Sequence, residues 1–245
     1  MTSAGSAPDD GSLPPDLVGL LEGLTTTRTI RRYLDEPVPE AALRTMLFAA
    51  TRAPSGSNRQ PFRMLVLTDG PKAIEAKRLI GAAAREVWAA KRSRDSYDTG
   101  SGAVGHSPKA RMARVMQRYV DDFESVPVLV LPCLQRYRAP NELEGASVYP
   151  AVQNLLLAAR GLGYGGALTA WHATVETELR ELLEIPDDVL VAGTVTIGKP
   201  EGGHGPVRRR PMSELIYTES WGSSPDWEDP PGTRFTSAGP PPTQR

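Results

Sequence analysis

An unbroken apolar run, PVLVLPCL at residues 127–134, limits the folds that this chain can adopt. A run of this length is typical of a buried strand and is far shorter than the roughly 20 residues that span a membrane as a helix. Two further aliphatic runs, RMLVLT at 63–68 and LVAGTVTI at 190–197, predict two more buried strands. The chain therefore needs other elements that cover a sheet.

Segments with the apolar spacing of helices separate these strands. The clearest begins at Pro39 and places Leu43, Met46 and Ala50 on one face. The other expected helices are residues 17–24, 71–90, 109–123, 149–162 and 177–183. Strands that alternate with long helices predict a layered α/β or α+β fold. The polar, glycine-containing segment 92–109 is expected to be a flexible loop or the start of a lid.

The sequence predicts one folded domain over residues 16–221. Residues 1–15 and 222–245 are small, polar and proline-containing, which is typical of disordered tails. Because 28 basic residues nearly balance 29 acidic ones, no net field favours nucleic acid or an anionic membrane surface. The first residues lack the basic start and apolar stretch of a secretory signal, so we expect a cytoplasmic protein.

The titratable side chains indicate no obvious catalytic group. The single cysteine, Cys133, lies in the apolar run, where we expect a buried and unreactive thiol. His172 is expected to pack or to form hydrogen bonds rather than to donate a proton, and His106 meets a substrate only if its loop closes. No cluster of His, Cys and acidic residues has the spacing of metal ligands, so no metal is expected.

Two short basic clusters lie near the ends of the folded region. The first contains Arg28, Thr29, Arg31 and Arg32, and the second contains Arg208, Arg209 and Arg210. Guanidinium groups offer planar, permanently charged donors, and a neighbouring hydroxyl adds another, which suits a phosphate dianion. Taken alone, the first cluster is more simply interpreted as a solvated basic turn, and the second is compatible with a solvated run of charge. Together, the two clusters suggest convergence on one phosphate.

A polar loop and a glycine-rich segment complete the candidate site. The loop RAPSGSNRQPF at 52–62 carries Ser55, Ser57, Asn58 and Gln60, whose donors and acceptors match the edge of a heterocycle or satisfy only their own backbone. The segment GLGYGG at 161–166 ends an apolar helix, so it is not a dinucleotide fingerprint. It allows close approach to a flat ligand, or it is simply a helix stop.

In order and spacing, four segments resemble the nitroreductase family of FMN enzymes. They are RTIRRY with EPVP behind it, APSGSNRQPF, ASVYPAVQNLLLAARGLGYGGALT, and GKP followed by RRRP. The resemblance covers residues 17–221, which is nearly all of the expected domain. It implies an α+β sandwich in which helices flank a central, mainly antiparallel sheet. It also implies an intertwined homodimer with two FMN sites at the subunit interface.

The resemblance also assigns roles to individual residues. The FMN phosphate would be held by Arg28, Thr29 and Arg31, with Arg32 beside them, and by Arg209 and Arg208. The other subunit would supply Ser55, Ser57, Asn58 and Gln60 to the ribityl chain and ring edge. One side of the ring would be lined by Gly166, Ala167, Leu168 and Thr169, with a backbone N–H near N5. The helix at 149–162 would be the dimer helix, or its apolar stripe would belong to the core of one chain.

Some residues depart from the family pattern. Thr27 stands where many relatives carry the first phosphate arginine, and 166–169 read GALT where several bacterial members have Pro-x-Glu-Gly. The segment 92–109 is an insertion relative to the small members, and we expect it to form a lid or a substrate wall. Because of these departures, the substrates of other family members are a weaker guide to the substrates of this chain.

The resemblance implies a two-step, ping-pong reaction. NADH or NADPH would pass a hydride to the flavin, and a nitroaromatic, a quinone or a similar small acceptor would then take the place of the nicotinamide. Two alternatives stay open. The first is a flavin enzyme with another reaction, either fragmentation of reduced flavin or reductive dehalogenation; the second is a flavin-binding protein without turnover. The choice between NADH and NADPH is left open by the sequence.

Overall fold

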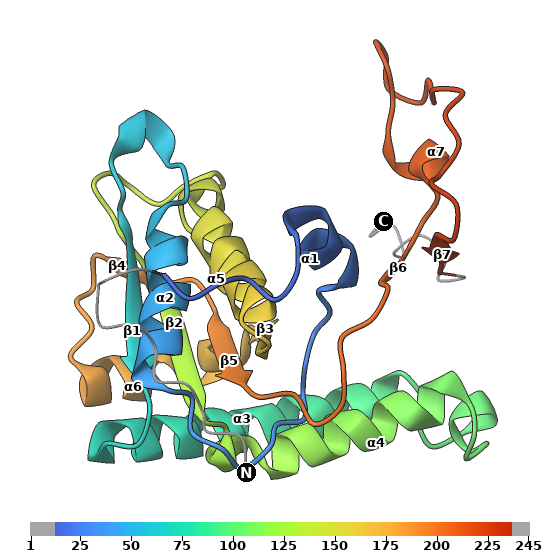
Figure 1. Ribbon diagram of the computed structural model, residues 1–245. Helices are drawn as coiled ribbons and strands as arrows, with labels where there is room; N and C mark the ends of the chain where they lie inside the picture. The colour runs from blue at the N-terminus through green and yellow to red at the C-terminus, as the bar shows by residue number, and fades with distance from the viewer. Residues whose placement is uncertain (1–12, 237–245) are drawn as a thin grey trace, which may run out of the picture.

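The computed structural model describes residues 13–236. Its helices are α1 (Leu20–Thr26), α2 (Glu40–Thr51), α3 (Pro71–Arg94), α4 (Pro108–Asp121), α5 (Tyr149–Gly161), α6 (Glu176–Leu183) and α7 (Met212–Leu215). Its strands are β1 (Phe62–Leu67), β2 (Val128–Gln135), β3 (Gly165–Thr169), β4 (Val189–Val191), β5 (Thr194–Gly198), β6 (Arg208–Arg209) and β7 (Arg234–Phe235). Figure 1 shows their arrangement.

The main sheet is antiparallel throughout. Its order is β1-β2-β5-β3, and β4 pairs with the far part of β2. The apolar run that suggested a buried strand forms β2, which pairs with β1 through Leu131 and Leu65 and is buried from Val128 to Leu134. The prediction of a central, mainly antiparallel sheet is confirmed.

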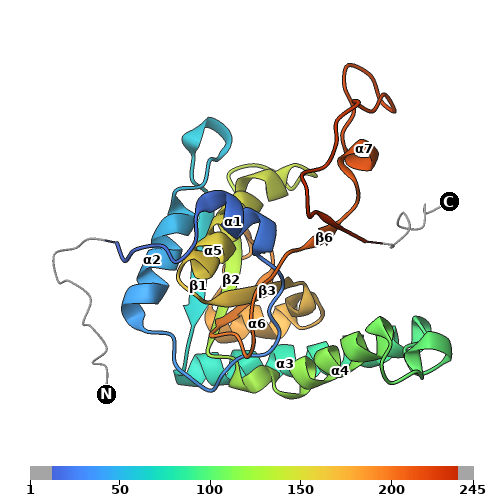
Figure 2. The same ribbon diagram turned by 45° about the vertical axis from the view of Figure 1, so that its right-hand side comes forward.

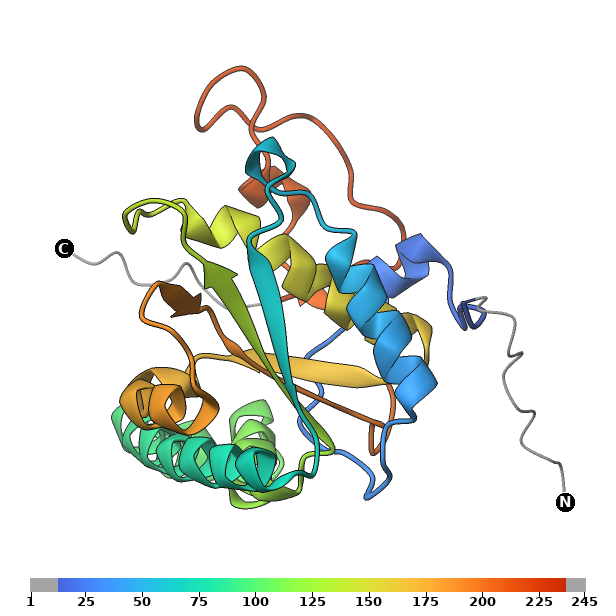
Figure 3. The ribbon, with the colours of Figure 1, turned by 90° about the vertical axis from the view of Figure 1, so that its left-hand side faces the viewer.

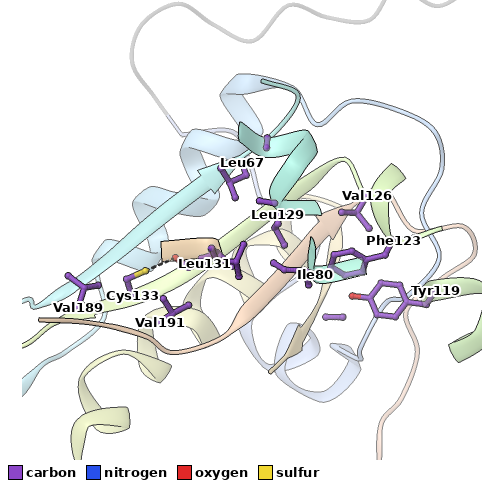
Figure 4. Packing of buried hydrophobic residues seen from close by; sticks show 14 residues of the cluster. Leu67, Ile80, Tyr119, Phe123, Val126, Leu129, Leu131, Cys133, Val189 and Val191 are labelled. Carbon is purple, nitrogen blue, oxygen red and sulfur yellow. Dashed lines mark hydrogen bonds between the residues drawn. The ribbon is translucent and has the colours of Figure 1, made fainter. Parts of the chain in front are cut away.

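Helices cover both faces of this sheet, which explains why β2 has no polar face. Figure 3 shows α2 and α5 on one side and α3, α4 and α6 on the other. On the first side, Met46 and Leu155 are fully buried against Val130. On the second side, Ile80 and Phe123 pack against the opposite face of the sheet, in the cluster shown in Figure 4. The predicted α+β sandwich is therefore present.

The strands differ from the sequence-based expectation in two places. The run 190–197 forms two strands, β4 and β5, which both pair with β2 and are separated by Ala192 and Gly193. The edge strand β3 was not expected, since Gly165 and Gly166 are poor strand formers. Strand β3 forms where two backbone segments approach so closely that only glycine fits at Gly166.

The expected loop 92–109 is largely the tip of a helical hairpin. The helix α3 continues to Arg94 and α4 begins at Pro108, so the hairpin projects from the body, as Figure 2 shows. At its tip, the ring of Tyr97 packs edge-on against Trp88 with centroids 5.1 Å apart. The Arg92 guanidinium bonds both to Asp98 and to Gln117. The insertion is thus tied to the two helices by specific contacts.

The last part of the described chain forms an arm that leaves the body (Figures 1 and 2). Its base is the pairing of β6 with β7, with Arg208 opposite Arg234. The arm exposes large apolar side chains, including Trp221, which is 93% exposed, and Trp227. Within residues 13–236, no helix is both long enough and apolar enough to cross a membrane.

Candidate functional site

Two of the four candidate segments, and the turn that leads to a third, lie together at the open edge of the sheet. The backbone N–H of Ile30 donates to the carbonyl oxygen of Gly166 at 2.9 Å, which joins the first basic cluster to β3. The turn after β5 runs beside the same cluster, because Glu201 N–H donates to Arg32 O at 3.0 Å. Further along, Val207 N–H donates to Thr25 O at 3.1 Å. The segment that leads into the second basic cluster therefore passes the end of α1.

Arg28 points toward this turn. A Cβ added at Gly205 would lie 3.9 Å from Nη1 of Arg28, so the guanidinium borders the turn. Among the described residues, Arg28 has no carboxylate within ion-pair distance. The neighbouring Thr29 is exposed. A guanidinium that has no carboxylate partner and lies beside this turn can bind an anion.

Two basic residues that the sequence did not single out lie near Arg28. The His204 ring is held by its Nε2, which lies 2.9 Å from the carbonyl oxygen of Tyr164, while its Nδ1 is buried without a protein partner. Burial, and then the charges of Arg160 and Arg28, lower the pKa of His204. Arg160 of α5 donates to Oγ1 of Thr26 at 3.1 Å. Arg160 belongs to the third of the family segments and His204 to the turn after β5, but neither residue was assigned a role from the sequence, and only the fold shows that they lie near Arg28.

Arg31 points to a different place from Arg28. It is half-buried beside Tyr33 and Tyr119, and burial without a carboxylate partner lowers its pKa. The hydroxyls of both tyrosines meet Oγ1 of Thr196, at 2.8 and 2.6 Å. Burial raises the pKa of Tyr119 to about 12, so this phenol stays protonated. The first cluster thus presents one cation toward the turn and another toward α4, while Arg32 Nη2 donates to Glu201 O.

The second basic cluster lies at the base of the arm. Arg208 and Arg209 are exposed on β6, and Nη1 of Arg209 donates only to the neighbouring carbonyl of Arg208. Arg210 differs, because its Nη1 lies 3.7 Å from Glu214. The structure brings the backbone that leads to this cluster next to α1, as described above. Within residues 13–236, no hydrogen bond joins the side chains of Arg208 or Arg209 to Arg28.

The glycines of β3 are required by packing within the chain. A Cβ at Gly166 would lie 2.5 Å from the backbone oxygen of Thr196 and 2.8 Å from Cδ2 of Leu156. A Cβ at Gly165 would lie 2.4 Å from Ile30. Gly163, with φ of 78°, ends α5 in the left-handed region. The helix-stop interpretation of this segment is thus supported, and the glycines pack the edge strand tightly against α5 and the basic segment.

The edge of β3 still presents backbone groups to the outside. Alternate residues of a strand direct their N–H and C=O groups to the same side. Because Gly166 O accepts from Ile30 on the outer side, the N–H of Leu168 also faces outward, and this residue is 42% exposed. By contrast, Ala167 is buried and Thr169 is half-buried. The end of β3 therefore offers a backbone donor at an accessible surface.

The polar loop is separated from the other segments. It precedes β1, and within residues 13–236 no hydrogen bond or ion pair joins it to the first basic cluster. Its side chains bond within the loop: Ser55 Oγ accepts from Gln60 N–H at 2.8 Å, and Gln60 Nε2 donates to Asn58 Oδ1 at 3.1 Å. This agrees with the interpretation that they satisfy their own loop.

The backbone of this loop is nevertheless unusual. Ser57, Asn58 and Gln60 all have φ near +50°, which is the left-handed region. Such residues cost of order 1–3 kcal/mol each and persist where the surroundings demand the conformation. Three residues with positive φ in this short loop indicate that its conformation does more than connect α2 to β1.

Two other sequence-based expectations are confirmed. Burial raises the pKa of the Cys133 thiol to about 11, so it stays protonated and unreactive. His172 is buried, with Nδ1 3.1 Å from Oγ1 of Thr194 and Nε2 3.0 Å from the carbonyl oxygen of Val191. Its role in this structure is to join neighbouring elements by hydrogen bonds.

The chain matches the model of one protein family. The model described as "Nitroreductase family" matches residues 24–199. This range contains the first basic cluster, the polar loop and the glycine-rich strand. The second basic cluster and the arm lie beyond it.

Individual relatives and solved structures agree with this match. The chain is 28% identical to a 4-nitrobenzoate reductase of Nocardioides sp., over 81% of this chain and 89% of the relative. A structure from Desulfovibrio desulfuricans, assigned as a nitroreductase and solved with FMN, is 26% identical with a TM-score of 0.58, covering 82% of this chain and 96% of that one. The NADPH:FMN oxidoreductase of Vibrio harveyi, solved with NAD+, shares the fold with a TM-score of 0.60 and 20% identity, covering 82% and 77%.

Proposed function

The chain belongs to the nitroreductase family, and from this premise we propose that it is an FMN-dependent oxidoreductase. In this proposal it takes a hydride from NADH or NADPH and reduces nitroaromatic, quinone or similar small acceptors. The observation that carries the proposal is the meeting of the Arg28 segment, the edge of β3 and the turn before Arg208 at one place. The 4-nitrobenzoate reductase relative and the FMN-bound structure support the same choice of cofactor and acceptor class.

The residues present fit FMN in charge and in the presence of an outward backbone donor. A phosphate dianion needs cations without other partners, and within the described residues Arg28, Arg31 and Arg209 have no carboxylate partner. We assign the phosphate to Arg28, Thr29 and Arg209. Arg31 would lie further along the same cofactor, since it points toward α4. The outward N–H of Leu168 would face the ring, where a backbone donor favours electron density gained on reduction.

When bound, FMN supplies the hydride chemistry, and the chain supplies position and electrostatics. We expect neither Tyr119 nor His172 to exchange a proton with the substrate, because the Tyr119 phenol stays protonated and both ring nitrogens of His172 are hydrogen-bonded within the core. Protons would therefore come from water. The nicotinamide and the acceptor would occupy one site in turn, which is a ping-pong scheme.

We further propose that the active form is a homodimer. A groove of about 530 Å³ lies between α1, α2 and α5, and Leu20, Phe48 and Leu157 line it. One face of α5 packs in the core through Leu155, while its other face lines this groove. The arm also exposes apolar side chains that its own chain does not cover. A second copy would cover both surfaces.

The dimer also explains the separated loop. Because the loop of residues 55–60 does not meet Arg28 within one chain, we propose that Ser55, Ser57, Asn58 and Gln60 reach the flavin of the other subunit. Its left-handed residues would then hold a shape that is complementary to the ribityl chain and the ring edge. A cytoplasmic location stays a prediction.

The absorbance spectrum tests this proposal. We expect the purified protein to show the bands of oxidised flavin, to bleach on anaerobic addition of NADPH or NADH, and to regain colour on addition of 4-nitrobenzoate or a quinone. A flavin that neither nucleotide bleaches would indicate a binding protein instead. Bleaching without recovery would contradict the proposed acceptor class and leave flavin fragmentation and reductive dehalogenation as the alternatives.

A further inference from the structure

One surface outside the proposed flavin contacts combines a half-exposed aromatic ring with positive charges that have no anionic partner among the described residues. Tyr137 follows β2 and is 50% exposed. The guanidinium carbon of Arg59 lies 4.7 Å from the centre of its ring, and that of Arg138 lies 5.4 Å from the same centre. One exposed tyrosine is thus contacted by two arginines from segments far apart in the sequence.

These two arginines differ from their neighbours in having no anionic partner. Arg136 gives two hydrogen bonds to Glu144, at 3.0 and 3.1 Å, and so uses the nearest carboxylate. Arg63 donates to the carbonyl oxygens of Gln60 and Phe62. Within residues 13–236, neither Arg59 nor Arg138 has a carboxylate within ion-pair distance. The charge of Arg138 is felt by Glu144, but that carboxylate is already bonded to Arg136.

The position of this cluster links it to the proposed function. Arg59 lies inside the polar loop, between Asn58 and Gln60, which we have assigned to the flavin of the other subunit. The left-handed residues on both sides of Arg59 fix the direction in which it leaves the loop. When a nicotinamide nucleotide places its nicotinamide ring on the flavin, its adenosine end must extend away from the flavin. Because Arg59 is itself a residue of this loop, the cluster that it forms with Tyr137 and Arg138 adjoins the loop assigned to the flavin.

The chemistry of the cluster matches a phosphorylated adenosine. A purine stacks on an aromatic or guanidinium plane, and a phosphate dianion is bound by arginine forks. We propose that Arg59, Tyr137 and Arg138 bind the 2′-phosphoadenosine end of NADPH, so that this protein uses NADPH in preference to NADH. This inference rests on the proposed function, because it takes its location from the loop assigned to the flavin.

Direct binding tests the proposal without turnover. The probes are 2′,5′-ADP, its positional isomer 3′,5′-ADP, and 5′-AMP, titrated into the purified protein by calorimetry. We expect 2′,5′-ADP to bind at least about tenfold more tightly than 5′-AMP and more tightly than 3′,5′-ADP. The double variant Arg59→Gln/Arg138→Gln should lose this preference. The control double variant Arg44→Gln/Arg78→Gln removes the same charge from exposed sites on α2 and α3 and should retain it.

Kinetics then separate this inference from the proposed function. In the Arg59/Arg138 double variant the KM for NADPH should rise about tenfold, while the KM for NADH and both kcat values stay unchanged. Equal binding of the two ADP isomers would reveal a general anion surface and would overturn the proposal. So would an equal loss in the control variant. If NADH still bleaches the flavin in either case, the proposed function stands although the inference has failed.

Discussion

The hydrogen bond from Ile30 N–H to Gly166 O, 2.9 Å long, joins two segments that are far apart in the sequence and carry different parts of the candidate site. Arg28, two residues before Ile30, faces the turn at Gly205. Leu168, two residues after Gly166, lies on the exposed outer edge of β3. The bond therefore fixes a cationic side chain relative to an accessible backbone donor. This is the arrangement that a cofactor with a phosphate at one end and a flat ring at the other requires.

The phosphate assignment predicts a selective loss of cofactor. The double variant Arg28→Ala/Arg209→Ala should lose FMN but remain a folded dimer, because each charge-assisted bond contributes about 1.5 to 3 kcal/mol. Equilibrium dialysis against FMN and riboflavin measures the effect. Affinity for riboflavin, which has no phosphate, should change little. Full retention of FMN would refute the assignment.

The close packing at β3 predicts a stability loss at one glycine. Gly166→Ala should destabilise the protein by about 1–3 kcal/mol, because the new Cβ would lie 2.5 Å from the backbone oxygen of Thr196, which cannot rotate away. Urea unfolding measures this change. Gly56→Ala is the matched control, since an added Cβ there meets nothing within 4 Å. Equal stability of the two variants would show that the edge strand is less tightly packed than described.

The buried histidine predicts how stability depends on pH. Burial lowers the pKa of His172 below its unfolded value of about 6.5, so just below that pH the unfolded chain binds more protons than the folded one. The free energy of unfolding should therefore fall as pH decreases from 7 through the unfolded pKa to the lower folded one. His204 has a shift in the same direction.

Substitution separates this histidine from the other titrating groups. His172→Gln should show a smaller decrease in unfolding free energy between pH 7 and pH 5 than the native protein, measured by urea unfolding. The control is His106→Gln, at a position between α3 and α4 outside the buried core. A pH dependence that is unchanged by His172→Gln would contradict the role of burial at this residue.

The strained loop predicts opposite effects on stability and on binding. Ser57→Gly/Asn58→Gly should raise the free energy of unfolding by roughly 1 kcal/mol, because glycine adopts positive φ without steric cost. The same change should weaken FMN binding, because two polar side chains and a fixed loop shape are lost. The matched control is Glu184→Gly, where φ is 56° at the end of α6. It should raise stability and leave FMN affinity unchanged.

The sequence predicted the elements whose patterns are strong. The helix α2 was expected from the spacing of Met46 and Ala50, and both are fully buried. The strand β2 was expected from its unbroken apolar run, and it lies at the centre of the fold. In both cases the local pattern agrees with the burial in the fold, so the pattern alone suffices to predict the element.

The remaining features depend on tertiary packing and leave no local pattern. The strand β3 is made by pairing with β5 and by the bond from Ile30, not by strand-forming residues such as valine. Likewise, His204 and Arg160 come next to Arg28 only because the turn after β5 and the end of α5 meet there. The sequence grouped Arg28 with Arg31, whereas the structure directs them to different neighbours.

A site shared between two subunits is the central claim, and mixed dimers test it most directly. One parent is Arg28→Ala/Arg209→Ala, which keeps a native loop, and the other is Ser57→Gly/Asn58→Gly, which keeps native arginines. If each flavin contacts the arginines of one chain and the loop of the other, a purified mixed dimer contains one fully native site. Its bound FMN, measured by absorbance after denaturation, should then be about half that of the native dimer. A mixed dimer that binds no more FMN than its parents would contradict the shared site.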